Sequence, residues 1–359
     1  MDHYSAGDKG RTAGGAVPRS DGRLRAVDDS TVIRHGGDLD EADATFPGGP
    51  RPWIDLSTGI NPVPYPLPPL APECFERLPT STELTAVEQE AAHAYGVKDP
   101  GVVVAAPGTQ TLIGLLPRLR PQGSVAVLGP TYGEHAAAWL RGGHRVAEAR
   151  SPDELPDAQV LVVVNPNNPD GRTLTLDDLR RLAGRAVQRE GWLVVDEAFA
   201  DLEEVASLAS DPPENTILLR SFGKTYGLAG LRLGFAIAPP AIATALRQVL
   251  GPWPLSGPAI AIGRIALADA AWRRAAARAR AADALRLDQA MAAVADRVVG
   301  GTRLFRLYEL ARAAALFDHL GRNGIWARRF QRNPAWLRFG LPAPAAPWAR
   351  LEEALGTFV

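Results

Sequence analysis

Between residues 102 and 196, short and continuously apolar runs alternate with longer segments whose apolar residues recur every three to four positions. The apolar runs lie at 102–104, Ser124–Leu128, Val160–Val164 and 192–195. A strand without polar alternation is buried on both faces, and helices cover both faces of a parallel sheet. The pattern therefore predicts a large, doubly wound, mostly parallel α/β domain. Its ligands are expected at the carboxyl ends of the strands.

Helical segments lie between these strands. They are predicted over residues 83–95, 111–119, 133–140 and 176–189. Thr175 is a suitable N-cap for the last of them, and Asp178 stands three residues further on, as in a capping box. Two more apolar runs, 216–219 and 231–237, flank a glycine-rich turn and have the character of strands.

The composition changes after the prolines at positions 239 and 240. Residues 259–299 are rich in alanine and arginine, with apolar residues at helical spacing, and predict a long amphipathic helix with one break at most. Its arginines are interpreted as a solvated face. The remaining segments predict a smaller α+β C-terminal domain, with strands at 303–310, 325–330 and 336–339 and helices at 313–323 and from Trp348.

Charge and cysteine content exclude several classes of protein. The formal net charge is −1, which gives no general surface for nucleic acid or a membrane. No apolar run approaches the roughly 20 residues that span a bilayer, and the N-terminus has no apolar core of a secretory signal. Cys74 is the single cysteine, which fits a reducing cytoplasm, and the six scattered histidines form no metal-ligand pattern. We therefore expect a cytoplasmic enzyme.

Lys224 stands in the glycine-lined turn directly after the run 216–219. A lysine that is desolvated there has a lowered pKa, and its neutral amine can attack a carbonyl to form a Schiff base. Ser221 and Arg232 flank it as a hydroxyl and a fixed cation, which together suit a phosphate. On its own, the same turn is equally consistent with an ordinary surface lysine.

Four features at strand ends precede this lysine. Gly108, Thr109 and Gln110 open a helix and offer backbone N–H groups to an anion. Tyr132 follows the next strand and could stack on a flat cofactor, although core packing is the simpler explanation for one aromatic residue. A proline-locked turn follows residue 164 and presents the amide of Asn168, and a buried strand ends in the carboxylate of Asp196, which should face a cation.

These groups together suit a flat, phosphorylated, cationic heteroaromatic aldehyde. Asp196 would pair with a protonated ring nitrogen, Asn168 would donate to a ring oxygen, and Lys224 would bond the aldehyde. Tyr132 would cover one face of the ring. The residues at 168, 196 and 224 are evenly spaced by 28 positions, which suits successive α/β units.

On these residues the sequence resembles fold-type I pyridoxal-phosphate enzymes of the aminotransferase superfamily. It is similar to the histidinol-phosphate aminotransferase branch and, within it, to the cobalamin-pathway threonine-phosphate decarboxylases. The resemblance runs from about residue 32 to near the C-terminus. Its motifs lie at 34–38, 55–62, 106–110, 165–172, 196–199, 221–235, 251–258, 324–330 and 337–342.

The resemblance implies further roles and shows two departures. It implies that Arg338 binds the α-carboxylate of the substrate, and that His35, Asn61 and Arg328 lie around the substrate phosphate and amino-acid head. Phe199 stands where aminotransferases usually carry a tyrosine, which removes a hydroxyl from the cofactor oxygen. Leu78 stands near a tyrosine that often reaches the phosphate of the neighbouring subunit.

The resemblance implies a homodimer that binds pyridoxal 5′-phosphate and decarboxylates L-threonine O-3-phosphate to (R)-1-amino-2-propanol O-2-phosphate in cobalamin biosynthesis. The alternative is a histidinol-phosphate or related aminotransferase. A non-catalytic regulator is disfavoured, because the residues ahead of Trp53 are too few for a DNA-binding domain and Lys224 is present. The expected division is a disordered extension at 1–30, an arm lining the cleft at 31–75, a cofactor-binding domain at 76–245 and a small domain at 246–359.

Overall fold

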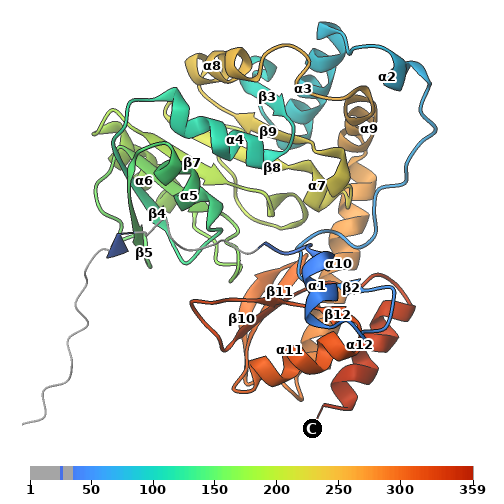
Figure 1. The fold of residues 1–359 in the computed structure, drawn as a ribbon. Coiled ribbons are helices and arrows are strands. Elements are labelled where there is room, and N and C mark those ends of the chain that lie inside the picture. The colour runs from blue at the N-terminus through green and yellow to red at the C-terminus, as the bar shows by residue number, and fades with distance from the viewer. Residues whose placement is uncertain (1–24, 27–34, 359) are drawn as a thin grey trace, which may run out of the picture.

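The computed structural model describes residues 25–26 and 35–358. Most of the predicted extension at 1–30 therefore lies outside the described residues. The described chain forms a larger unit with an eight-stranded sheet and a smaller unit below it in the view of Figure 1. None of the helices in these ranges combines the length and the apolar character that crossing a bilayer requires.

The eight-stranded sheet has the order β1-β5-β4-β6-β7-β8-β9-β3. Strands β4 to β8 are parallel to one another, whereas β9 is antiparallel to both of its neighbours and β1 is antiparallel to β5. The mostly parallel sheet predicted from the sequence is confirmed. Its strands are β1 (Arg25–Ala26), β3 (Val103–Ala106), β4 (Ser124–Leu128), β5 (Arg145–Ala149), β6 (Val160–Val164), β7 (Trp192–Asp196), β8 (Thr216–Ser221) and β9 (Gly234–Ile237).

Helices cover both faces of this sheet, as expected for continuously apolar strands. Alternate residues of each strand contribute to two separate cores, so that Val163 faces one layer and Val162 the other. One layer contains α3 (Ser81–Tyr95), α6 (Leu176–Val187) and α9 (Gly257–Ala268). The opposite layer contains α4 (Thr109–Leu115), α5 (Glu134–Arg141) and α8 (Pro240–Leu250).

Local capping explains where several helices begin. The predicted capping box is confirmed: Thr175 accepts from the backbone N–H of Asp178, whose carboxylate accepts from the Thr175 backbone. Thr80 and Glu83 form a second one at the start of α3. Helix α8 was not predicted, although Pro240 suits its first turn because the missing N–H would have no helical partner there.

The long helix predicted over 259–299 is wrong in its last part. The break falls at Asp269, whose side chain accepts from the backbone N–H of Trp272 and opens α10 (Ala270–Met291). Residues Arg297–Thr302 form strand β10 instead. A β-branched pair followed by Gly300 and Gly301 disfavours a helix there, and pairing with the next strand decides the outcome.

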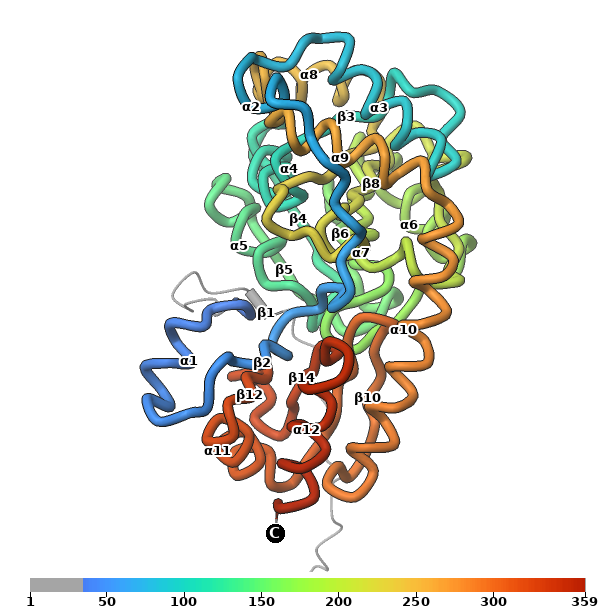
Figure 2. The backbone as a smooth tube through the Cα atoms, turned by 90° about the vertical axis from the view of Figure 1, so that its right-hand side faces the viewer, coloured from blue at the N-terminus to red at the C-terminus, as the bar shows by residue number. Residues whose placement is uncertain are grey.

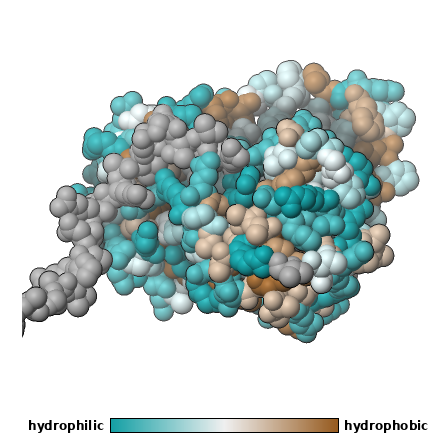
Figure 3. All heavy atoms as spheres, turned by 60° about the horizontal axis from the view of Figure 1, so that its bottom comes forward, coloured by the Kyte–Doolittle hydropathy of each residue, from teal (hydrophilic) through white to brown (hydrophobic). Residues whose placement is uncertain are grey.

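The smaller unit is built on an antiparallel sheet of order β10-β11-β14-β13. The predicted strand at 325–330 is divided, because its first half pairs with β2 and its second half with β14. Figure 3 shows a face on which hydrophilic residues surround smaller hydrophobic areas. The elements are β2 (Ile54–Asp55), β11 (Phe305–Glu309), α11 (Ala313–Arg322), β12 (Ile325–Trp326), β13 (Arg328–Arg329), β14 (Trp336–Gly340) and α12 (Ala346–Gly356).

The segment at 35–75 connects the two units. Helix α1 (Leu39–Thr45) and β2 pack into the small unit, where Ala42, Ile54 and Leu56 belong to its core. Figure 2 shows the chain continuing from β2 along the large unit to α2 (Glu73–Glu76). Helix α10 runs beside the small unit and makes the second long connection.

Candidate active site

Lys224 lies in the short helix α7 (Phe222–Thr225), which follows β8 directly. Its Nζ lies 5.1 Å from the centroid of the Phe199 ring, and no group in the described part of the chain pairs with it. Burial lowers the pKa of the Lys224 amine, and the nearby Arg338 and Arg232 act in the same direction, against Asp196. A lowered pKa favours the neutral amine, which is the form that attacks a carbonyl.

The main chain around this lysine is fixed by Asn61. The backbone N–H of Asn61 donates to the Lys224 carbonyl at 2.9 Å, and its side-chain amide donates to the Thr225 carbonyl at 3.0 Å. The Oδ1 of Asn61 accepts from Arg280 of α10 at 3.0 Å. Asn61 was predicted beside the substrate, and the structure gives it partners on both side-chain atoms. We assign it the role of positioning the lysine turn.

Asp196 ends β7, and each of its carboxylate oxygens has one hydrogen-bond partner. Its Oδ2 lies 2.8 Å from Nε2 of His135, and its Oδ1 accepts from the Ala198 backbone N–H at 3.0 Å. Burial by itself would raise the pKa of Asp196, but His135 and the charge of Lys224 outweigh it and lower that pKa. The carboxylate stays ionised and can neutralise a ring cation.

His135 was missed by the sequence reasoning. It is buried in the first turn of α5, three residues after Tyr132, and therefore lies at the same edge of the sheet as Asp196. The sequence clue that could have identified His135 as a site residue was its position just beyond the end of β4. Its neighbour in sequence, Tyr132, was selected there for its ring alone.

Arg338 and Asn168 meet across the two units. Arg338 NH1 donates to Asn168 Oδ1 at 2.5 Å, and NH2 donates to the Ser57 carbonyl at 2.7 Å. The Asn168 amide nitrogen is left to donate elsewhere, as its predicted role requires. The Arg338 Nε is buried without a partner in the described chain. Burial and the charge of Arg328 lower the pKa of Arg338 to about 9, against the opposing carboxylate of Asp55.

This arrangement is suited to an anion. A buried guanidinium with an unused donor is costly unless a negative group approaches it. Arg328 is the cross-strand neighbour of Arg338 in the β13–β14 pair, so two cations share one end of the small sheet. A carboxylate and a phosphate on one substrate are the groups these cations can hold.

The predicted phosphate-binding residues come together where β9 begins. Ser221 is the register partner of Gly234, and a Cβ on Gly234 would lie 2.6 Å from the Thr109 nitrogen. Gly108 has a φ of +80°, and a Cβ there would lie 2.6 Å from an Arg232 guanidinium nitrogen. These close approaches require glycine. They leave a cradle of N–H groups, two hydroxyls and one guanidinium.

Tyr132 and Gln110 lie beside the buried carboxylate. The Tyr132 hydroxyl donates to Gln110 Oε1 at 3.0 Å, and the Tyr132 ring is edge-on to His135 with centroids 6.1 Å apart. Burial raises the pKa of Tyr132 to about 12, with the charges of Glu134 and Asp196 acting in the same direction. The phenol is therefore neutral and presents an uncharged ring to the site.

The remaining predicted residues lie at the edge of the site or away from it. The His35 side chain is about half exposed, and its Nε2 lies 3.2 Å from Glu134 Oε1. Phe199 packs edge-on against Phe305, with centroids 4.9 Å apart, and forms the apolar wall beside Lys224. Leu78 is 61% exposed and lies just after α2.

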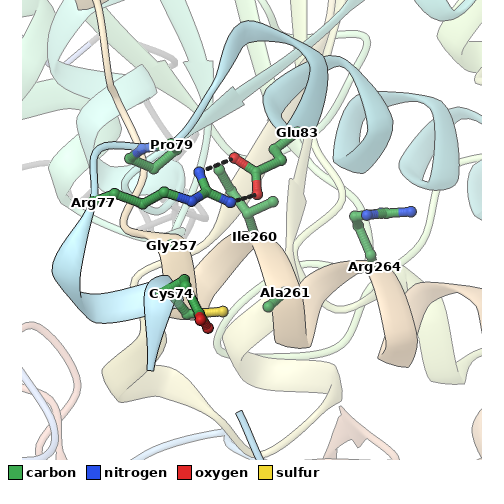
Figure 4. A pocket seen from close by; sticks show the side chains of 9 residues that line it. Cys74, Arg77, Pro79, Glu83, Gly257, Ile260, Ala261 and Arg264 are labelled. Atoms are coloured by element: carbon green, nitrogen blue, oxygen red, sulfur yellow. Dashed lines mark hydrogen bonds and ion pairs between the residues drawn. The ribbon is translucent and has the colours of Figure 1, made fainter. Parts of the chain in front are cut away.

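Two hollows occur elsewhere in the described chain. The smaller one, of about 60 Å³, lies between α2, α3 and α9, and its wall includes Cys74 and the paired Arg77 and Glu83 (Figure 4). The larger one, of about 430 Å³, lies between β2 and α12 and contains Asn61 in its wall. Neither contains the lysine. No group of three or more His, Cys, Asp or Glu in the described ranges could hold a metal ion.

The chain is similar to known proteins of one family. Residues 70–357 match the family described as aminotransferase class I and II. The chain is 42% identical to a threonine-phosphate decarboxylase of Pseudomonas aeruginosa, over 90% of this chain and 97% of the relative. It is also 42% identical to one of a Sinorhizobium species, over 91% of this chain and 98% of the relative.

A solved structure supports the fold. The chain resembles the crystal structure of histidinol-phosphate aminotransferase from Sinorhizobium meliloti in complex with pyridoxal-5′-phosphate, with a TM-score of 0.72 and 19% identity. The match covers 92% of this chain and 96% of that one.

The residues present fit pyridoxal phosphate as the cofactor. Lys224 offers an unpaired, desolvated amine, and Asp196 offers a buried ionised carboxylate. Thr109, Ser221 and Arg232 are brought together by close approaches at Gly108 and Gly234 and offer hydroxyls and a guanidinium to an anion. Each group has the chemistry that one part of this cofactor requires.

The lysine assignment is tested by borohydride reduction in the presence of pyridoxal phosphate. Lys9, Lys98 and Lys224 are the lysines of the chain, so the label can be located by peptide mapping. We expect the label on Lys224 in the unaltered protein and in the control Lys98→Ala, and none in Lys224→Ala. A label that persists in Lys224→Ala would refute the assignment.

The role of His135 is tested by pH. In the unaltered protein the Asp196 pKa is lowered, so the carboxylate is ionised throughout the neutral range and is protonated only at low pH. His135→Leu removes a hydrogen bond worth about 1.5–3 kcal/mol, and the Asp196 pKa should rise by roughly one to two units. The acid-side loss of the visible band of bound cofactor should move to higher pH by that amount. The exposed His93→Ala is the control, and an unmoved acid limb would contradict the role.

Proposed function

The chain belongs to the class I and II aminotransferase family, and from that premise we propose that it is a pyridoxal-phosphate-dependent threonine-phosphate decarboxylase. It converts L-threonine O-3-phosphate to (R)-1-amino-2-propanol O-2-phosphate and CO₂, a step of cobalamin biosynthesis. The observation that carries this proposal is 42% identity to threonine-phosphate decarboxylases over nearly the whole chain.

The cofactor, when bound, supplies an electron-withdrawing ring that stabilises negative charge at the substrate Cα. Lys224, Asp196 and Asn168 would hold its aldehyde, ring nitrogen and ring oxygen. Asp196 keeps a proton at the ring nitrogen because its own pKa is lowered. Tyr132 lies neutral beside the site, and the cradle of Thr109, Ser221 and Arg232 takes the cofactor phosphate.

The chain's own residues determine which substrate bond is broken. Arg338 binds the α-carboxylate through the guanidinium donor that has no protein partner. His35 and Arg328 both lie near Tyr132 and would bind the substrate phosphate. If this grip sets the carboxylate perpendicular to the ring, CO₂ leaves. Lys224, once it has taken up a proton from the substrate ammonium group, would return that proton to Cα.

The alternative is transamination by a histidinol-phosphate aminotransferase. The fold accommodates both reactions, since a solved enzyme of that name shares it. At 19% identity, however, that likeness speaks for the fold alone, whereas the decarboxylases are 42% identical.

The direct test is incubation with L-threonine O-3-phosphate and pyridoxal phosphate, without any keto acid. We expect stoichiometric CO₂ and amino-propanol phosphate from the unaltered protein and none from Lys224→Ala. A requirement for 2-oxoglutarate, with accumulation of the pyridoxamine form of the cofactor, would instead establish transamination.

Arg338 is tested by substitution. Removing one partner of a buried, charge-assisted pair costs about 2–5 kcal/mol, so Arg338→Ala should lower kcat/KM by roughly 30-fold or more. Arg338→Lys keeps the charge but loses the planar fork and should recover only part of that loss. The surface Arg332→Ala should leave kcat/KM unchanged. Because Arg338 also bonds Asn168 and Ser57, thermal unfolding must be compared, and a loss of stability without a loss of kcat/KM would contradict the role.

We also propose that the enzyme is a cytoplasmic homodimer. Phe75 is 69% exposed and Leu78 61%, and both lie at α2, which packs on α9 where Ile265 is also exposed. Large apolar side chains gathered on one surface favour burial by a partner. The single cysteine fits a reducing compartment.

The dimer is tested by light scattering. Phe75→Asp places a charge within the proposed contact and should yield monomers at micromolar concentration. Val187→Asp is the matched control, since Val187 is similarly exposed at 57% but lies on α6. A protein that is monomeric without substitution would refute the proposal.

A further inference from the structure

Glu134 joins several of the residues assigned above but has no role in the proposed function. It is the first residue of α5, and its side chain is almost completely buried. Its Oε2 accepts from Gln110 Nε2 at 3.1 Å and from Arg141 at 2.8 Å. Its Oε1 faces His35 Nε2 at 3.2 Å. One carboxylate thus contacts the large unit on one side and the N-terminal arm on the other.

The first set of contacts fixes the direction of a hydrogen-bond chain. An ionised carboxylate only accepts, so the nitrogen of the Gln110 amide must face Glu134. The Gln110 oxygen then faces Tyr132 and accepts a hydrogen bond from the Tyr132 hydroxyl at 3.0 Å. Burial would raise the pKa of Glu134, but Arg141 and His35 lower it, so the acceptor is maintained. Glu134 therefore determines where the phenol of Tyr132 points.

The contact between Glu134 and His35 links the two units through a series of hydrogen bonds. Gly37 donates its backbone N–H to Ser57 Oγ at 2.7 Å, and the Ser57 carbonyl accepts from Arg338 at 2.7 Å. Gly36 packs so closely that a Cβ there would lie 2.3 Å from the Ser57 carbonyl oxygen. The residues at 35–37 are thus fixed to the small unit, and the contact of His35 with Glu134 ties them to the large unit.

We propose that Glu134 is a positioning residue with two separable effects. By accepting from Gln110 it holds the Tyr132 ring in place over the cofactor, and by its charge it holds His35 at the mouth of the substrate site. The effect on His35 rests on the proposed function, whereas the effect on Tyr132 rests only on cofactor binding. The first effect needs an acceptor, whereas the second needs a negative charge.

Two substitutions in the holoenzyme separate these effects. Glu134→Gln keeps an oxygen acceptor for Gln110 and removes the charge. We expect its Kd for pyridoxal phosphate and the circular dichroism of the cofactor band to stay within twofold, while KM for threonine phosphate rises about tenfold at nearly constant kcat. Glu134→Ala removes both the acceptor and the charge. The Kd for pyridoxal phosphate should then also rise about tenfold, and the circular dichroism of the cofactor band should change.

Two further measurements distinguish positioning from a general structural effect. His35→Ala combined with Glu134→Gln should raise KM no more than either single change, because the two residues act through one contact. Glu214→Gln is the matched control, an exposed glutamate in a loop of the large unit. It should change neither Kd nor KM.

Three results would overturn the inference: a Kd unaltered in Glu134→Ala, a KM unaltered in Glu134→Gln, or additive effects with His35→Ala. Its failure is distinct from failure of the proposed function. A protein that releases no CO₂, but whose Glu134→Ala form binds pyridoxal phosphate more weakly, supports the cofactor half of the inference and refutes the decarboxylase. CO₂ release together with an unaltered cofactor affinity in Glu134→Ala would support the decarboxylase and refute the cofactor half of the inference.

Discussion

The buried contact between Asp196 and His135 is the interaction on which the candidate site depends. A carboxylate at the end of a fully apolar strand would tend to protonate, because burial penalises its charge. His135 reverses that tendency from the first turn of α5, which follows β4, at 2.8 Å. The negative charge that results opposes the lowering of the Lys224 pKa, so the two buried groups balance each other. Asp196 thus stays ionised and can neutralise a ring cation, while burial lowers the pKa of the Lys224 amine.

The second constraint is that the substrate side of the site is shared between the two units. Arg338 comes from the small sheet, Asn168 from a loop of the large unit, and Ser57 from the connecting segment. Asn61 of the same segment holds the lysine turn. A shift of one unit relative to the other would therefore move the anion-binding groups relative to the amine.

Much of the fold follows from local patterns. The strands at Ser124–Leu128 and Val160–Val164 have the predicted bounds, because their apolar runs are followed by Gly129-Pro130 and by Asn165-Pro166. The capping box at Thr175 fixes the start of α6 for reasons contained in four residues. Predictions failed where pairing overrides propensity: β10 replaced the end of a helix, and one run at 325–330 was divided between two sheets.

Local sequence patterns are enough to identify the chemical groups at the strand ends, since a polar residue that follows an apolar run lies at the edge of the sheet. Lys224, Asp196, Asn168 and the glycine-lined anion cradle could be selected on that basis. Their partners could be found only from the folded structure. His135 is 61 residues from Asp196, and Arg338 is 170 residues from Asn168. Contacts over such separations depend on how the layers and units pack, which no local pattern encodes.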